Sequence, residues 1–180
     1  AESGYDILYL QQDMREFELY GTVKAVVSVC DSMNYILTEK DLEQVFACVN
    51  NYLDPGGLFL FDLKTIHYFR DVCGDCVLAD SREEGSFIWE NSWFEEEQIN
   101  EYDLTLFIRE KTGLYRREQE LHDQRGYEID TVRQILIQAG MEWVSALDAD
   151  TMKEPTESSE RIYIIAREKG KKKQNEKQKG

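Results

Sequence analysis

The sequence has few histidines and prolines, with two of each among 180 residues. Two histidines are too few for a His-rich metal site. The eleven glycines include no Gly-x-Gly, so the fingerprint with which nicotinamide-dependent oxidoreductases bind their dinucleotide is missing. No Ser/His/Asp or Cys/His arrangement for nucleophilic catalysis stands out either. These absences argue against an oxidoreductase and against a triad hydrolase.

Long apolar runs are also absent. No segment approaches the roughly 20 apolar residues of a membrane span, and no charged-then-apolar leader is visible. The four cysteines do not form a secreted disulfide framework, and Cys73-Gly74-Asp75-Cys76 is a lone CxxC without a second pair at zinc spacing. We interpret them as reduced thiols and expect a cytoplasmic protein with no membrane span and no metal.

Negative charge dominates the composition. The formal net charge is -15, yet the segment from Arg167 to Gly180 holds seven Lys or Arg against two Glu, so the other residues carry about -20. Such a body repels phosphate backbones, which makes nucleic-acid binding unfavourable. We expect residues 168–180 to form a basic, disordered tail.

The clearest structural signal is the stretch from Leu53 to Asp62. Pro55 and the glycines that follow it end a helix and turn the chain. Leu58 to Phe61 is apolar without alternation, which is typical of a parallel strand covered on both faces. Asp62 then places a carboxylate at the end of the sheet where ligands bind in α/β proteins.

Upstream, the pattern predicts strands over Tyr5–Leu10 and Val23–Val29, and a helix that begins at the Thr38 cap. Strand, helix and strand in this order predict a right-handed parallel crossover. Downstream, we expect a short helix at 66–72, an antiparallel meander of strands at 87–94, 102–108 and 114–124, a helix from Asp130 to a stop at Gly140, and a final strand pair at 142–147 and 161–167.

Polar residues follow three of the predicted strands. They are Asp13-Met14, the loop from Cys30 to Tyr35, and Asp62 with the residues to Thr65. Because the carboxyl ends of parallel strands meet at one edge of a sheet, these groups should lie together. An alternative role for Asp13 is to cap the short turn that follows it.

The order and spacing of these motifs resemble class I S-adenosylmethionine-dependent methyltransferases. The likeness rests on Gln12-Asp13-Met14, on Cys30-Asp31-Ser32-Met33-Asn34-Tyr35, and on Leu53-Asp54-Pro55-Gly56-Gly57 with Phe61-Asp62. It covers Tyr5 to Arg167 and is closest to small bacterial enzymes with an antiparallel insertion after the fifth strand. The resemblance implies an α/β, Rossmann-like sheet over residues 1–167, without its first βαβ unit, with an antiparallel meander at 66–127 and a C-terminal strand hairpin.

The resemblance also implies S-adenosylmethionine as cofactor. Asp13 stands where the family's carboxylate accepts a hydrogen bond from the adenine amino group. Met14 stands where a backbone N–H and an apolar side chain contact the adenine ring. Val29, Cys30 and Ser32 stand on the loop that borders the methionine part of the cofactor.

Other positions would face the methyl acceptor. Asp31 could orient or deprotonate it as the catalytic residue, beside Asn34 and Tyr35. A sulfonium methyl group is already activated, so catalysis would come mainly from holding the acceptor in line. Further candidates for the acceptor pocket are His122, Arg125 and Tyr127, for which the alternative is an ordinary role in packing.

Two parts of the family pattern are missing: the glycine-rich first loop and the acidic residue that ends the second strand. The family places both upstream of where Ala1 stands. We therefore expect this chain to be the C-terminal part of a methyltransferase, inactive alone, that acts on a small neutral or cationic acceptor and is compatible with a homodimer. The alternative is a non-catalytic binding or assembly module that completes its sheet with a partner.

Overall fold

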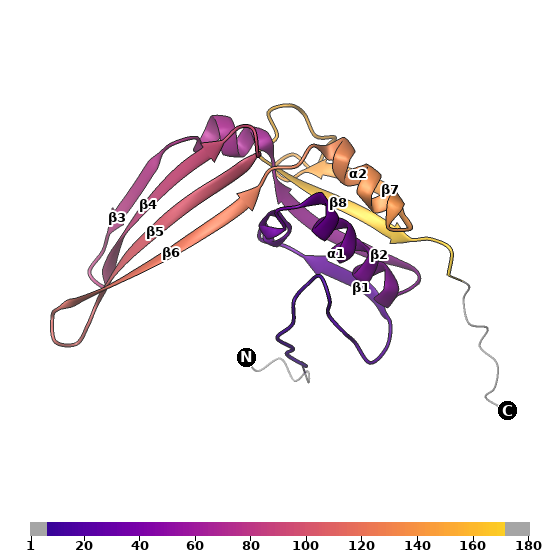
Figure 1. Ribbon diagram of the computed structural model, residues 1–180, viewed down its shortest axis with the longest axis horizontal. Coiled ribbons are helices and arrows are strands. Elements are labelled where there is room, and N and C mark those ends of the chain that lie inside the picture. Colours follow the sequence, from indigo (N-terminus) through magenta and orange to yellow (C-terminus); the bar gives the residue numbers. More distant parts are fainter. Residues whose placement is uncertain (1–6, 172–180) are drawn as a thin grey trace.

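The computed structural model describes residues 7–171, which form two four-stranded sheets and two α-helices (Figure 1). The first sheet has the order β1-β2-β8-β7, and the second has the order β3-β4-β5-β6. The elements of the first sheet and its helices are β1 (Val23–Ser28), α1 (Glu39–Tyr52), β2 (Leu53–Lys64), α2 (Ile129–Gln138), β7 (Met141–Asp148) and β8 (Arg161–Glu168). Those of the second sheet are β3 (Val77–Ser81), β4 (Gly85–Phe94), β5 (Ile99–Arg109) and β6 (Tyr115–Arg125). Two short turns, η1 (Ser32–Tyr35, 3-10) and η2 (Tyr68–Cys73, π), complete the list.

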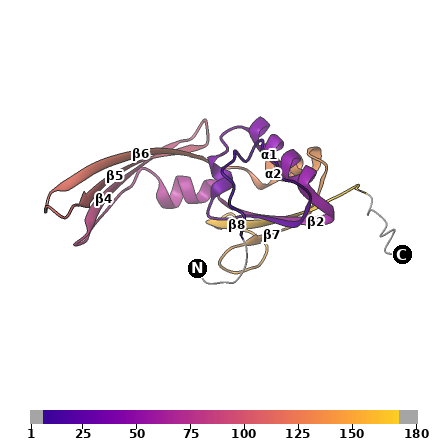
Figure 2. The ribbon, with the colours of Figure 1, turned by 90° about the horizontal axis from the view of Figure 1, so that it is seen from below.

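The first sheet combines a parallel pair with an antiparallel hairpin. β1 pairs in parallel with β2, and β8 lies between β2 and β7, antiparallel to both. This confirms the predicted parallel crossover and the final strand pair. α1 and α2 cover the same face of the sheet (Figure 2). Against them pack Phe59 and Phe61, whose rings lie 6.0 and 5.4 Å from the ring of Phe46.

The opposite face of this sheet is open. Val27 is 63% exposed and Leu58 is 40% exposed, and in residues 7–171 no helix packs over them. The prediction that the Leu58 strand is covered on both faces was therefore wrong for the second face. An apolar run without alternation fits burial on both faces, but it cannot reveal which covering elements the described chain contains.

Turn chemistry sets the ends of α1. The Thr38 hydroxyl accepts a hydrogen bond from the amide of Asp41 at 3.1 Å, which confirms the predicted N-cap. At the other end the helix leads straight into β2, since Leu53 already pairs with Val23. The Pro-Gly-Gly segment is a bulge inside this strand rather than a turn before it, with Gly56 at φ 76°.

One predicted strand is not found. Residues 7–10 of the proposed Tyr5–Leu10 strand lie in irregular structure with exposed side chains, and residues 5 and 6 fall outside the described part. A strand needs a neighbour to pair its backbone groups, and in residues 7–171 no strand lies beside this segment. Strand propensity alone therefore misled the prediction.

The meander forms a sheet of its own that projects away from the first sheet (Figure 1). Its three predicted strands are β4, β5 and β6, and the structure adds β3, whose exposed residues carry no clear period. The chain enters and leaves this arm at neighbouring points. A Cβ atom at Gly126 would lie 2.8 Å from the Ile66 side chain, so glycine allows the two segments to pass closely.

The ordered chain extends into the predicted tail. Glu168 is the last residue of β8, and the Lys171 ammonium donates to the carbonyl oxygens of Asn51 and Leu53 at 2.9 and 2.7 Å. Residues 172–180 lie outside the described part. Neither helix found between residues 7 and 171 has both the length and the apolar character needed to cross a membrane.

Two adjacent residues of α2 test the position of the core. Leu136 is fully buried and Ile137 is 55% exposed. We expect Leu136→Ala to lower the free energy of unfolding by about 2–5 kcal/mol, because it leaves a cavity, and Ile137→Ala by about 0.5 kcal/mol. Urea unfolding followed by circular dichroism measures both, and equal losses would contradict the assigned core.

Candidate functional site

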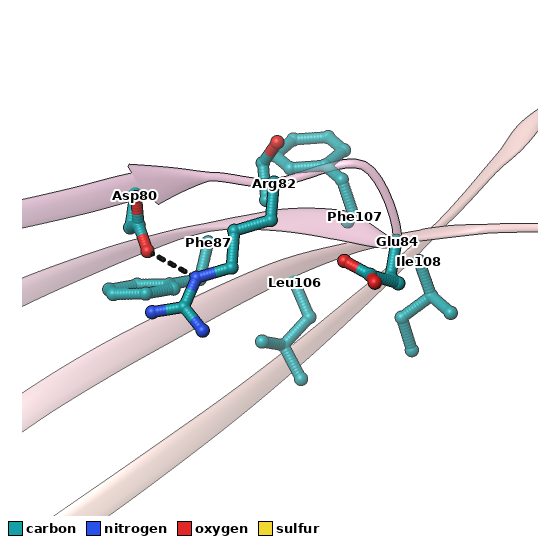
Figure 3. A pocket seen from close by; sticks show the side chains of 9 residues that line it. Asp80, Arg82, Glu84, Phe87, Leu106, Phe107 and Ile108 are labelled. Carbon is teal, nitrogen blue, oxygen red and sulfur yellow. Dashed lines mark hydrogen bonds and ion pairs between the residues drawn. The ribbon is translucent and has the colours of Figure 1, made fainter.

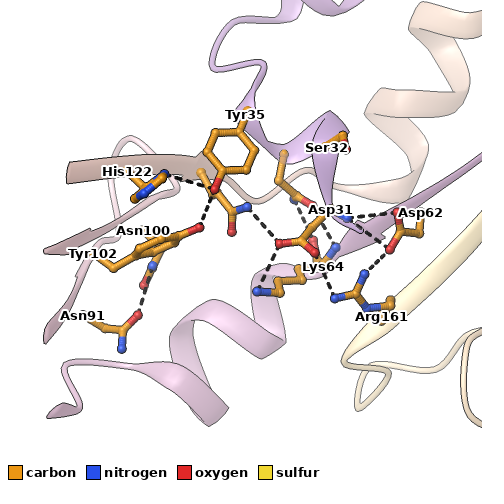
Figure 4. Close-up of polar contacts among 12 residues, drawn as sticks. Asp31, Ser32, Tyr35, Asp62, Lys64, Asn91, Asn100, Tyr102, His122 and Arg161 are labelled. Atoms are coloured by element: carbon orange, nitrogen blue, oxygen red, sulfur yellow. Dashed lines mark hydrogen bonds and ion pairs between the residues drawn. The ribbon is translucent and has the colours of Figure 1, made fainter. Parts of the chain in front are cut away.

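Asp31 stands at the centre of a group of charged and polar side chains (Figure 4). It follows β1 and caps η1. Its carboxylate accepts hydrogen bonds from Gln124 Nε2 at 2.9 Å and Arg161 Nη2 at 3.1 Å, and it pairs with Lys64 Nζ at 3.2 Å. Side chains from β2, β6 and β8 thus converge on one carboxylate at the end of β1.

Asp62 supports the backbone of the same loop. It is 1% exposed, accepts the Asp31 N–H at 3.1 Å and forms an ion pair with Arg161. Cys30 and Asp31 have φ angles of 64° and 52°, a left-handed conformation that non-glycine residues seldom adopt. Such conformations persist where the surroundings fix them, and the Asp62 carboxylate does so here.

These contacts determine how Asp31 ionises. Burial acts to raise its pKa, but the hydrogen bond from Gln124, the charge of Lys64 and the hydrogen bonds from Lys64 and Arg161 outweigh burial and hold the pKa below its usual value. A carboxylate stabilised in this way is a weak base. The arrangement therefore suits Asp31 to orienting an acceptor better than to deprotonating it.

A cluster of aromatic side chains lies beside this charged group. The Tyr35 hydroxyl is 2.8 Å from the Tyr102 hydroxyl and 3.2 Å from Nδ1 of His122. The Tyr102 and His122 rings stack at 5.1 Å, and Trp89 lies 4.8 Å from Tyr102. Figure 4 shows Tyr35 reaching from η1 towards Tyr102 and His122 on the second sheet. The two sheets thus meet at this cluster.

Three predicted acceptor residues brace the loop between η1 and α1. Asn34 is fully buried and bonds to the backbone of Lys64 and Arg125. Arg125 donates to the Leu37 carbonyl at 2.9 Å and lies 5.0 Å from the Tyr127 ring, and the Tyr127 hydroxyl donates to the Ile36 carbonyl. All three side chains make contacts within the protein that hold the loop in place, and their role towards the acceptor stays a prediction.

Asp13 and Met14 lie on a different side of this loop. They line a cavity of about 520 Å³ together with residues 35–38. The exposed Asp13 carboxylate accepts from the amide and guanidinium of Arg15 at 2.9 and 2.6 Å, and its pKa is lowered to about 2 mainly by the guanidinium bond. The predicted capping of the local turn is thus present. Asp13 does not contact Asp31 or Asp62, so only two of the three predicted polar groups meet directly.

Comparison with known proteins relates the chain to two curated relatives, although no family model matches it. It is 34% identical over 161 residues to "Putative methyltransferase GWCH70_2453" of Geobacillus sp. (strain WCH70), covering 89% of this chain and 65% of the relative. It is 33% identical over 167 residues to "Putative methyltransferase YqeM" of Bacillus subtilis (strain 168), covering 92% of this chain and 67% of the relative. The chain therefore spans about two thirds of the length of both.

Solved structures show the same fold. An S-adenosylmethionine-dependent methyltransferase from Clostridium acetobutylicum ATCC 824 superposes with a TM-score of 0.84 at 24% identity, over 93% of this chain and 67% of that one. The chain belongs to the same methyltransferase family as the two curated relatives, and its fold is that of S-adenosylmethionine-dependent methyltransferases. Lower likeness extends to the sugar N-methyltransferase KedS8 from Streptoalloteichus sp. ATCC 53650, with a TM-score of 0.67, 17% identity and coverage of 86% and 60%. The amino pentose methyltransferase CalS10 from Micromonospora echinaspora, solved with its cofactor bound, has a TM-score of 0.63, 16% identity and coverage of 87% and 63%.

The cofactor of this methyltransferase family is S-adenosylmethionine, and the described residues are compatible with it. The two Asp13 oxygens accept three hydrogen bonds from Arg15, which leaves lone-pair capacity for one more N–H donor. Val29 and Cys30 are exposed at the end of β1, and Ser32 donates to the Val29 carbonyl at 2.9 Å, which stabilises the loop. Val29 and Cys30 are therefore accessible, whereas Asp13 and Ser32 already have partners within the protein.

Sequence reasoning did not assign four residues of the candidate site: Lys64, Tyr102, Gln124 and Arg161. Lys64 was visible only as a polar residue at a strand end, and Tyr102 as one aromatic among several. Arg161 reaches the site because it pairs with Lys64 in the β2–β8 register. Alternation along β6 could have indicated Gln124, because it lies two residues from His122 and therefore on the same face of the strand. Only the non-local strand pairing brings these residues to Asp31.

A second cavity lies at the outer end of the meander, away from this site. It has a volume of about 470 Å³, and Figure 3 shows the Phe87, Leu106 and Ile108 side chains on one side of the sheet beside the Asp80–Arg82 pair. Phe107 projects from the opposite side (Figure 3). The polar side chains of this cavity do not converge on a common point, so we assign no catalytic or binding function to it.

The lowered pKa of Asp31 predicts a pH dependence of stability. An Asp in the unfolded chain titrates near pH 3.9, so the stabilisation is complete above about pH 4 and is lost as pH falls through the lower folded value. We expect Asp31→Asn to be less stable than the wild type at pH 7, and the difference to shrink towards pH 3. Urea unfolding across this range measures it.

The exposed Asp150 supplies the control, since Asp150→Asn removes a carboxylate charge away from the groups that surround Asp31. A gap between wild type and Asp31→Asn that stays constant with pH would show that the Asp31 charge is not stabilised by folding.

Proposed function

We propose that these residues form the C-terminal, acceptor-side part of a methyltransferase that transfers the methyl group of S-adenosylmethionine to a small-molecule acceptor. The observation that carries the proposal is the junction of the two sheets. There Asp31 and Tyr35, from the loop after β1, face Tyr102, His122 and Gln124 from the meander. A polar, aromatic site next to the exposed end of β1 is the place for an acceptor to be held in line.

The roles divide along the loop from Val29 to Tyr35. Val29, Cys30 and Ser32 would border the methionine part of the cofactor, and Asp13 and Met14 would hold the adenine. The bound cofactor supplies an activated methyl group. Asp31, fixed by two cations and an amide, would orient the acceptor, and Tyr35 would contact it directly.

A small acceptor is favoured by the walls of the site. The two acidic groups, Asp31 and Asp62, are matched by Lys64 and Arg161, so the cluster carries no net charge that would select a polyanion. The rings of Tyr102 and His122 offer flat, uncharged surfaces. KedS8 is a sugar N-methyltransferase and CalS10 is an amino pentose methyltransferase, which agrees with an acceptor of this size.

Cellular setting and assembly belong to the same proposal. All four cysteines are free thiols, which fits a reducing compartment such as the cytoplasm. A homodimer would cover apolar side chains of the open sheet face, such as Val27 and Leu58. The second candidate, a non-catalytic module, is favoured by the outer edge of β1, which pairs with no other strand of the described chain. Cofactor binding separates the two.

Calorimetry with S-adenosylhomocysteine tests the cofactor site. We expect the product of the native gene to bind it and Asp13→Ala to bind about 10–100-fold more weakly, because a charge-assisted hydrogen bond is lost. We expect residues 1–180 alone not to bind measurably. Asp80→Ala is the matched control, since Asp80 also pairs with a nearby arginine and backbone amide but lies on β3. No binding by the native gene product would favour the module.

A panel of acceptors identifies the substrate class. We expect transfer of a labelled methyl group to small amines or alcohols, and none to RNA or to a protein extract. Asp31→Asn should lower kcat by about tenfold or more, since the orientation of the acceptor is lost. Transfer confined to RNA or protein would overturn the small-molecule proposal.

A further inference from the structure

A chain of hydrogen bonds leads from the interior of the site to the surface. It begins at the buried Tyr102 hydroxyl, passes to Tyr35 at 2.8 Å, continues to Nδ1 of His122 at 3.2 Å, and ends where Nε2 of His122 meets Glu120 Oε2 at 3.2 Å. The Glu120 side chain is 56% exposed, so the chain reaches solvent. Tyr35, His122 and Tyr102 belong to three different elements, η1, β6 and β5.

Hydrogen-bonding capacity fixes the direction of this chain. The Glu120 carboxylate only accepts, so Nε2 of a neutral His122 must carry the proton and Nδ1 must accept. The Tyr35 hydroxyl then donates to Nδ1, and Tyr102 must donate to Tyr35. Burial, followed by the bond with Tyr35, raises the pKa of Tyr102, which keeps it a donor. Tyr35 Oη retains one lone pair for a further donor.

Asp31 is poorly suited to remove a proton from the acceptor. Its oxygens already form an ion pair with Lys64 and accept hydrogen bonds from Arg161 and Gln124, and these contacts stabilise its ionised form. A neutral imidazole beside an exposed carboxylate is not surrounded by cations that would oppose its taking up a proton. Imidazole is also the side chain best matched to proton transfer near neutral pH. The base for the reaction is therefore to be sought across the site from Asp31.

We infer that Tyr35 and His122 form a proton relay that carries the acceptor's proton to solvent, with Glu120 as its outer end. The acceptor is then an amine or an alcohol, because it must bring an N–H or O–H to Tyr35. Its lone pair forms the new bond to the methyl carbon, and the electron pair of the broken carbon–sulfur bond stays on sulfur. The acceptor's proton moves to Tyr35 Oη, the proton of Tyr35 moves to Nδ1 of His122, and Glu120 balances the imidazolium charge.

The groups around His122 are consistent with this role. Glu120 on its own strand is the anion that pairs with it, Tyr102 faces it from β5, and Tyr35 faces it from η1. Asp31 acts on Tyr102 through its charge. Tyr102 would stabilise the oxygen of Tyr35 while its proton is in transfer, so Tyr102 is a positioning residue and Tyr35 is the catalytic one.

The inference rests on the proposed methyl transfer, but nitrogen NMR tests it without turnover. The chain contains two histidines, and the structure predicts opposite tautomers for them. His122 should carry its proton on Nε2, whereas His67 should carry it on Nδ1, which lies 2.8 Å from the Asp71 carboxylate. In the native protein labelled with ¹⁵N-histidine, Tyr35→Phe should shift the Nδ1 resonance of His122 and leave His67 unchanged. A proton on Nδ1 of His122 would overturn the relay.

Kinetics then separate a relay from a structural contact. With S-adenosylmethionine and the fastest acceptor of the panel, kcat/KM of the wild type should fall at acid pH, as expected for a reaction that needs a free base. His122→Gln should lose this acid limb and about 100-fold in kcat/KM. His67→Gln is the matched control and should keep the wild-type profile.

The two proposals fail in different ways. A native protein that binds S-adenosylhomocysteine and methylates amines, but whose His122→Gln variant keeps the wild-type pH profile, would overturn the relay and leave methyl transfer standing. A protein that binds no cofactor would overturn methyl transfer itself.

Discussion

The ion cluster of Asp31, Asp62, Lys64 and Arg161 is the constraint on which the site depends. It ties β2 and β8 to the loop after β1 through two acidic and two basic groups. A buried ion pair need not stabilise a fold more than apolar packing would, but removing one partner leaves an uncompensated charge, at a cost of about 3–5 kcal/mol. The cluster is therefore best understood as a means of holding Cys30 and Asp31 in a left-handed conformation that this sequence would not otherwise adopt.

From this loop the two halves of the site diverge. Towards β1, Val29 and Cys30 are exposed, and Met14 lines the cavity formed with residues 35–38. Towards the meander, Tyr35 enters an aromatic and amide environment built on β5 and β6. Asn34, Arg125 and Tyr127 fix the loop from which both halves extend.

Local signals in the sequence predicted much of this fold. Alternation identified β5, capping identified the start of α1, and the motif from Cys30 to Tyr35 indicated the family before any fold was known. Local signals could not predict which strands pair with each other. Arg161 lies 130 residues from Asp31 and reaches it only because β8 pairs with β2. The same limit explains why residues 7–10 form no strand: their apolar side chains have strand propensity, but no neighbouring strand pairs with them among the described residues. It also explains the missed β3, whose exposed residues pair with β4 but show no alternation.

The close passage of the chain at Ile66 and Gly126 has a consequence for how such enzymes diversify. The chain leaves and re-enters the first sheet at this crossing, so the outer turns of the second sheet can change in length without altering the chain path near Asp62. The inner ends of β5 and β6 have no such freedom, because Tyr102, His122 and Gln124 contact Tyr35 and Asp31.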